Sequence, residues 1–66
     1  MSISDLTEAD KGRQVVYHGN YGGPLEFGII TSWNDKYIFV RYGVGATSAA
    51  TSPEDLTWAW QVMMRD

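Results

Sequence analysis

Residues 26–42 read EFGIITSWNDKYIFVRY, and this stretch decides the fold. Aromatic and β-branched residues, which fit a pleated and half-buried surface, fill both halves of it. Asn34-Asp35 separates the halves, and these two residue types tolerate the left-handed backbone that a tight hairpin turn demands. The stretch therefore predicts two antiparallel strands, at residues 26–33 and 36–42, joined by a turn.

Three further strands are predicted by shorter alternating segments, at residues 13–18, 46–51 and 57–62. In the last of these, Trp58 and Trp60 share one face if the segment is extended. Residues 19–24 are rich in Gly, Asn and Pro, which interrupt regular secondary structure, so we expect them to form a loop.

Two segments carry the signals of short helical turns. Residues 4–12 contain Thr7, whose side chain can accept from the following amides, and Gly12, which can end the turn. Residues 52–55 read SPED, in which Ser suits the cap, Pro the first helical position and acidic residues the next two. We expect one 3₁₀ turn there, just before the last strand.

Five short strands with such a turn before the last predict an all-β fold, a small SH3-like barrel. A sandwich needs about seven strands. An OB-fold is the nearest alternative, although its strands are longer and its helix lies between the third and fourth strands. We interpret residues 1–66 as a single domain whose core is thin, because a chain this short buries only about 60% of its unfolded surface.

Composition excludes several classes of protein. The chain has no cysteine and one histidine, His18, so we expect no disulfide, no metal site and no cofactor. Hydrophobic residues make up 44% of it, too many for a disordered chain, yet no apolar run approaches the roughly 20 residues that span a bilayer. The first residues lack the basic start and apolar centre of a signal peptide, so we expect a cytosolic location.

Charge argues against duplex nucleic acid as the partner. The net charge is −3, and the five Lys and Arg residues are outnumbered by eight Asp and Glu residues. Affinity for nucleic acid comes from neutralising phosphates, which an acidic chain does poorly. Residues 11–42 are mildly basic, with four bases against two acids, and this keeps single-stranded RNA or DNA as an alternative.

Three segments carry a resemblance to a known group: residues 12–17, 28–42 and 47–56. In this order they resemble small proteins encoded by tailed bacteriophages and prophages, over roughly residues 7–58. The resemblance implies a phage or prophage origin and a location in the bacterial cytoplasm, and it transfers no functional residue. The broader pattern is similar to Tudor-like and KOW-like barrels, which bind methylated side chains, peptides or RNA.

No constellation for catalysis is recognisable, so we expect no enzyme. His18 is the one candidate base, and it lies beside the glycine-rich loop. Glu54 and Asp55 are accounted for as residues of the 3₁₀ turn, while Glu26 and Asp35 flank strands where solvated charges are common. The glycines of residues 19–23 lack the Lys and Ser/Thr of a phosphate loop and a helix after them.

Aromatic residues give the one positive indication of function. The chain has nine of them, more than a core this small can enclose. Alternation assigns five side chains to the interior: Val15, Ile30, Ile38, Val40 and Leu56. It leaves an outer band along the hairpin: Phe27, Ile29, Trp33, Tyr37 and Phe39. Arg41 shares the face of Tyr37 and Phe39, and Tyr21 in the loop has few neighbours to bury it, which makes it a candidate partner anchor.

Two explanations of the outer band are open. It is covered by the chain's own termini, through Leu6, Trp60, Val62, Met63 and Met64, or it is an interface with a second copy or a host or phage protein. Met63 and Met64 fit core packing better than a binding surface. A protein-interaction module is therefore one hypothesis. The other is a nucleic-acid-associated barrel, in which basic side chains contact phosphates and Tyr37 or Trp33 stacks on a nucleobase. The basic residues are Arg13, Lys36 and Arg41.

Overall fold

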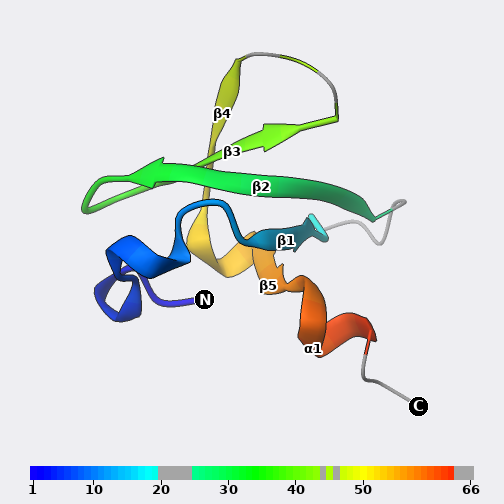
Figure 1. The fold of residues 1–66 in the computed structure, drawn as a ribbon, viewed down its shortest axis with the longest axis horizontal. Helices are drawn as coiled ribbons and strands as arrows, with labels where there is room; N and C mark the ends of the chain where they lie inside the picture. Colours follow the sequence, from blue (N-terminus) through cyan, green and yellow to red (C-terminus); the bar gives the residue numbers. More distant parts are fainter. Residues whose placement is uncertain (20–24, 44, 46, 64–66) are drawn as a thin grey trace.

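A five-stranded antiparallel sheet organises the chain, as seen in a computed structural model that describes residues 1–19, 25–43, 45 and 47–63 (Figure 1). Its strands are β1 (Gln14–Tyr17), β2 (Glu26–Trp33), β3 (Ile38–Tyr42), β4 (Ser48–Thr51) and β5 (Leu56–Trp58). They lie in the order β4-β3-β2-β1-β5, so β4 and β5 form the two edges. Short helical turns complete the fold: η1 (Ile3–Asp5), η2 (Glu8–Asp10), η3 (Pro53–Asp55) and α1 (Ala59–Met63). The predicted β-rich fold and the 3₁₀ turn before the last strand are confirmed.

The turn between β2 and β3 is made by the side chain of Asn34. Its Oδ1 accepts hydrogen bonds from the backbone N–H groups of Lys36 (2.8 Å) and Tyr37 (2.7 Å). The Asn34 N–H donates to the Tyr37 carbonyl (3.0 Å). Among the described residues only Gly12 and Gly43 have positive φ, so the expected left-handed backbone at the turn is wrong. Asn34 acts through its carboxamide, and β3 begins at Ile38, two residues later than predicted.

A bulge interrupts the pairing of β2 with β3. Ile30 lies opposite Val40, and Trp33 lies opposite Ile38, so the interval is three residues in β2 and two in β3. Thr31 falls within this irregular step. Residues directly opposite each other share a face of the sheet. The extra residue therefore turns Trp33 to the face of Ile38, the side opposite to the one that uninterrupted alternation predicts.

The hydroxyl of Thr31 fixes the bulge to both neighbouring strands. It donates to the carbonyl oxygen of Phe39 in β3 (3.1 Å) and lies 2.7 Å from the hydroxyl oxygen of Ser48 in β4. These bonds link the bulge to the edge strand.

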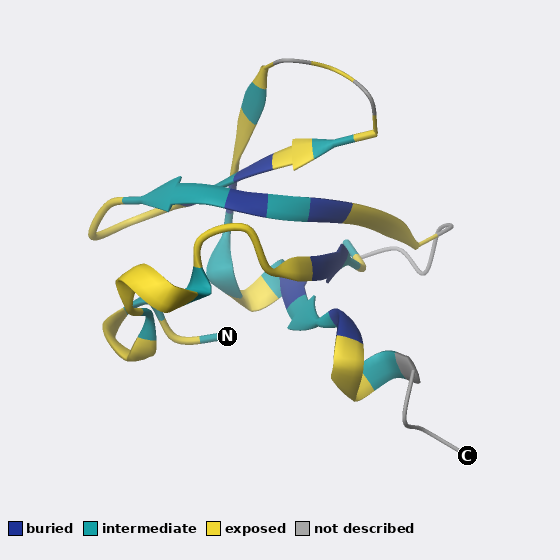
Figure 2. Cartoon of the chain, in the orientation of Figure 1, coloured by how far each residue is buried: buried dark blue, intermediate teal, exposed yellow. Residues whose placement is uncertain are grey.

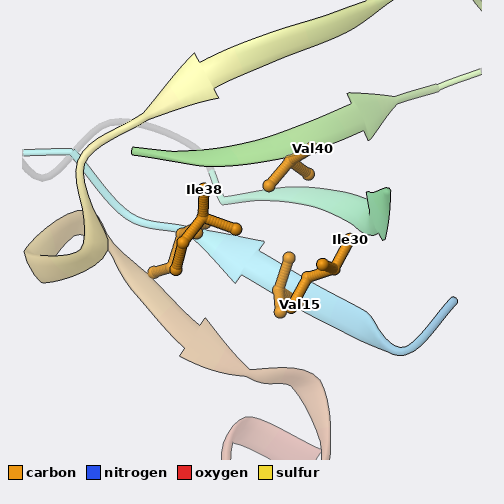
Figure 3. Packing of buried hydrophobic residues seen from close by; sticks show 5 residues of the cluster. Val15, Ile30, Ile38 and Val40 are labelled. Carbon is orange, nitrogen blue, oxygen red and sulfur yellow. The ribbon is translucent and has the colours of Figure 1, made fainter. Parts of the chain in front are cut away.

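The core lies on one face of the sheet, which we call the inner face. Five buried side chains form one cluster there, and Figure 3 shows four of them labelled, converging from β1, β2 and β3: Val15, Ile30, Ile38 and Val40, with Leu56 the fifth. All five were predicted from alternation, and the prediction is confirmed. Partly buried residues pack around them: Met1, Ile3, Leu6, Tyr17, Trp33, Tyr42 and Trp58. The amino-terminal turns thus cover the inner face.

The carboxyl end of the chain departs from the predicted strand at 57–62. β5 ends at Trp58, and α1 follows. Ala59 is buried at the start of the helix, whereas Trp60 is 48% exposed and so does not share the packed position of Trp58. The fifth strand is present, but its predicted extension beyond Trp58 is wrong, because alternation of two tryptophans resembles a strand whereas Ala, Gln and Met favour a helix. α1 contacts β1, whose outward-facing Val16 is fully buried (Figure 2).

The carboxylate of Asp10 holds the turn before β1. It accepts hydrogen bonds from the Thr7 N–H (2.9 Å), the Thr7 hydroxyl (3.4 Å) and the Arg13 guanidinium (2.9 Å). These contacts belong to a capping box at the start of η2, in which Thr7 is the cap residue, as predicted. Gly12 follows with φ +90°, and its N–H donates to the carbonyl oxygen of Ile30 in β2 (2.8 Å). The turn is thereby attached to the centre of the sheet.

We predict that Gly28→Ala is strongly destabilising. A Cβ at Gly28 would overlap Cγ1 of Val40 and lie 2.9 Å from Cδ1 of Tyr42. Overpacking of this kind costs about 1–3 kcal/mol. Gly45→Ala is the matched control, because its Cβ would meet only the Tyr42 carbonyl oxygen, at 3.8 Å. Urea denaturation measures both, and equal stabilities of the two variants would contradict the packing.

A second prediction concerns the stability of the fold in acid. The Thr7 backbone N–H, followed by the Arg13 guanidinium, lowers the pKa of Asp10 below its ordinary value of 3.8. A lowered folded-state pKa means stability that is present above the ordinary pKa and lost as pH falls through the lowered one. Asp10→Asn should therefore lose less stability than the wild type between about pH 6 and pH 2.

Thermal denaturation across this pH range measures the difference. Asp5→Asn removes the same charge from a side chain that makes no hydrogen bond among the described residues, and it should follow the wild type. Parallel acid limbs for the wild type and Asp10→Asn would show that Asp10 has no such role.

Candidate functional site

The outer face of the sheet carries an apolar row. Phe27 lies opposite Val16 of β1, and Ile29 lies opposite Arg41 of β3, so these four side chains share a face. Phe39 lies on the same face, opposite Ser32 and Ala50. We call Phe27, Ile29, Phe39 and Arg41 the outer aromatic face. This much of the predicted outer band is placed as expected.

Exposure differs along this face. Phe27, near the start of β2, is 46% exposed, and Tyr37, in the turn at the other end of β2, is 41% exposed. Ile29 and Phe39 are half-buried, and Arg41 is exposed. A large aromatic ring with nearly half its surface in water, on a strand inside the sheet order, is therefore the main apolar feature of the outer face.

Trp33 does not belong to this face. It packs against the inner core cluster, and the Lys11 ammonium lies 5.6 Å from the centre of its ring. The prediction that placed it in the outer band is wrong because the bulge at Thr31 reverses the alternation of β2. The role of Trp33 in partner binding stays a prediction. A partner could contact only the part of the Trp33 side chain that the core leaves exposed.

Among the described residues, the ends of the chain cover the outer face only in part. Leu6 packs on the inner cluster, and Trp60 is exposed. Val62 lines a hollow with Val16 and Leu25, so α1 covers the outer face over β1. Phe27 keeps its exposure beyond this covered region. Tyr21, Met64 and most of the loop that holds Tyr21 lie outside the described residues, so the role of Tyr21 as an anchor stays a prediction.

The three basic residues expected to contact phosphates do not lie on one surface. Arg13 donates to Asp10 (2.9 Å), and its guanidinium carbon lies 4.1 Å from the ring centre of Trp58. Lys36 lies in the β2–β3 turn, and Arg41 lies toward the other end of β3. Arg41 borders a shallow hollow with Phe27 and Ile29, which makes it the one base of the three beside the outer aromatic face.

A second candidate site lies where β1 and β3 end, and sequence reasoning did not identify it. A hollow of about 440 Å³ is lined by Tyr17, Glu26, Tyr42 and Asp55, together with residues 49–52. The rings of Tyr17 and Tyr42 meet edge to face, with centroids 6.2 Å apart and planes at 75°. We call this the strand-end hollow. Tyr17, Glu26 and Tyr42 stand at strand ends, and Asp55 ends η3, so the paired sheet and this turn together bring the four side chains into one place.

Tyr42 is the most constrained group of the strand-end hollow. Its hydroxyl lies 2.9 Å from the Thr51 hydroxyl, within hydrogen-bond distance. Burial raises its pKa, the hydrogen bond with Thr51 opposes that rise, and the negative charges of Glu26 and Asp55 add to it. The two carboxylates therefore impose a negative potential on this phenol.

Groups for catalysis or metal binding are sparse in the described part of the chain. His18 is exposed, and the contact that positions it is its backbone N–H donating to the Asp55 carbonyl (3.0 Å). Residues 1–19, 25–43, 45 and 47–63 contain no group of three His, Asp or Glu side chains placed to hold a metal ion. In the same residues, no helix has the length and apolar character needed to cross a membrane.

Comparisons with protein families, with curated proteins and with solved structures give no match for this chain. The geometry of the two surfaces is therefore the basis for function.

Proposed function

We propose that this chain is a non-enzymatic protein-interaction module built as an SH3-like barrel. The sheet order β4-β3-β2-β1-β5, with a single 3₁₀ turn between the edge strands, supports the barrel. Thr51 and Leu56, on either side of that turn, are both buried, so the connection follows the core from one edge to the other. Such barrels present their loops and strand faces to partners.

The exposed ring of Phe27 is the observation that carries the proposal. It stands on β2 between strands on both sides, opposite fully buried Val16. Aromatic side chains and Arg are enriched where proteins bind each other, and Arg41 lies on the same face. The partner is another protein of the host or the phage, which buries Phe27 and Tyr37.

The setting of this activity follows from the resemblance of residues 7–58 to small proteins of tailed bacteriophages and prophages. It supports an accessory role in the bacterial cytoplasm during infection or lysogeny. A module without catalytic groups would act there by occupying a surface of its partner.

A nucleic-acid-associated barrel that contacts single-stranded RNA or DNA is the second candidate function. One observation favours it, since Arg41 beside Phe27 offers a cation next to an exposed ring. Arg13, held by Asp10, contributes less than the sequence suggests. This candidate requires binding to a fluorescent single strand at about 50 mM salt that falls steeply as salt rises, and no binding at that salt would remove it.

For the protein partner, we predict that Phe27→Ala and Tyr37→Ala each weaken capture by about tenfold, as the loss of an interface aromatic does. Both rings are over 40% exposed, so their removal leaves the core cluster intact. The melting temperature should stay within a few degrees of the wild type. Trp60→Ala is the matched control, because Trp60 is as exposed but lies on α1.

The measurement is a tagged pull-down from bacterial lysate with and without nuclease, followed by titration of the captured protein. A nuclease-resistant partner lost in both variants and kept in Trp60→Ala is the expected result. Unfolding of Phe27→Ala and Tyr37→Ala, or undiminished capture by both, would contradict the proposal. Sedimentation of the pure protein shows whether a second copy is the partner.

A further inference from the structure

The strand-end hollow has the charge and the aromatic surface of a site for a cation. Glu26 and Asp55 both line it, and its described lining residues include no Lys, Arg or His. The ion pairs formed within the described residues are Lys11–Glu8 and Arg13–Asp10, and neither involves a carboxylate of the hollow. A group that enters the hollow therefore meets two negative charges that have no described ion-pair partner.

Two tyrosine rings add a second attraction for a cation. The rings of Tyr17 and Tyr42 stand nearly perpendicular, and both contribute to the lining. The electron-rich face of a tyrosine attracts a cation within about 6 Å. The contact between the Tyr42 and Thr51 hydroxyls holds the Tyr42 ring in place before any ligand arrives. Because the Tyr42 ring is already held in place, a ligand that binds it does not have to immobilise it, and binding costs less conformational entropy.

The wall formed by residues 49–52 belongs to the open edge of the sheet. β4 pairs with β3, and no strand of the described residues lies on its other side. It reads Ser-Ala-Ala-Thr, and Ala49 and Ala50 are exposed. Natural edge strands are commonly protected by Lys, Pro or a bulge, and β4 has none of these. Its small side chains leave room for another backbone to approach.

We propose that the free edge of β4 binds an extended segment of another protein as an added strand, with an arginine side chain of that segment in the strand-end hollow. Main-chain hydrogen bonds to an edge supply affinity in such complexes, and a neighbouring pocket supplies specificity. Arginine fits better than lysine, because a planar guanidinium stacks on a ring while it donates to carboxylates. This site goes beyond the proposed function, since it uses the edge and inner side of the sheet and not the outer aromatic face.

The probe is a five-residue peptide, acetyl-Thr-Val-Arg-Val-Thr-amide, titrated into the ¹⁵N-labelled full chain and followed by nuclear magnetic resonance. The same peptide with citrulline in place of arginine keeps the shape and removes the charge. The expected result is saturable shifts at residues 48–52 and at Tyr42, weakened about tenfold or more by citrulline. Absence of shifts at millimolar peptide, or equal binding of both peptides, would overturn the proposal.

Charge variants separate the hollow from a general effect of net charge. Glu26→Gln and Asp55→Asn should each weaken arginine-peptide binding by about threefold or more, since each removes one partner of the cation. Glu54→Gln removes the same charge from the neighbouring residue, which does not line the hollow, and should bind like the wild type. Circular dichroism checks that all three fold. Equal weakening in all three would overturn a specific cation site.

Two more arms test the added strand and its independence. Alternate amides of a strand point to opposite sides, so a peptide N-methylated at both valines is compared with one N-methylated at the arginine and the last threonine. The peptide whose methylated amides face β4 should lose binding; retained binding of both would overturn strand addition. Phe27→Ala should bind the peptide as the wild type does, even if it fails to capture a partner through the outer aromatic face. Loss of peptide binding in Phe27→Ala would place the peptide on that face, and a dimer formed through β4 in the free protein would make a second copy the occupant.

Discussion

The bulge at Thr31 is the constraint on which the two faces of this protein depend. One extra residue in β2 changes the register against β3, so Ile30 and Trp33 both face the core although they are three positions apart. Thr31 uses its hydroxyl to hold this step against Phe39 and Ser48. Without the extra residue Trp33 would face outward and the end of the core beside Ile38 would lose its largest neighbour.

The inward position of Trp33 also determines where the amino-terminal residues pack. Met1, Ile3 and Leu6 pack around the same cluster as Trp33, and Lys11 lies over its ring. A thin core of five buried side chains gains a second layer in this way, which a chain of this size needs because it buries so little surface. On the outer face, α1 contacts β1, where Val16 is fully buried, whereas Phe27 of β2 is 46% exposed.

Period-two alternation predicted the interior of the sheet because the strands are regular where it was applied. Val15, Ile38, Val40 and Leu56 follow it directly, and Ile30 lies just before the bulge. The hairpin follows from the carboxamide of Asn34, and the turn at residues 53–55 follows from Pro53 at its start, although the Ser52 side chain makes no cap hydrogen bond. Local preference and tertiary packing agree at these positions.

The features that sequence reasoning missed all depend on contacts between distant residues. The bulge contains no glycine that would mark it in the sequence. Its residue Thr31 is instead held by groups in β3 and β4. α1 replaces the predicted strand beyond Trp58, and Ala59 is buried at the start of this helix. The strand-end hollow joins Tyr17, Glu26 and Tyr42, which strand register brings together, with Asp55 of η3.

Cross-strand nuclear Overhauser effects between backbone protons of β2 and β3 test the central claim most directly. The structure predicts contacts of Ile30 with Val40 and of Trp33 with Ile38, together with contacts from the Trp33 ring to the methyl groups of Ile38 or Leu6. An uninterrupted register, in which Ile30 pairs with Val40 and Ser32 pairs with Ile38, would contradict the bulge and the division of the molecule into inner and outer faces.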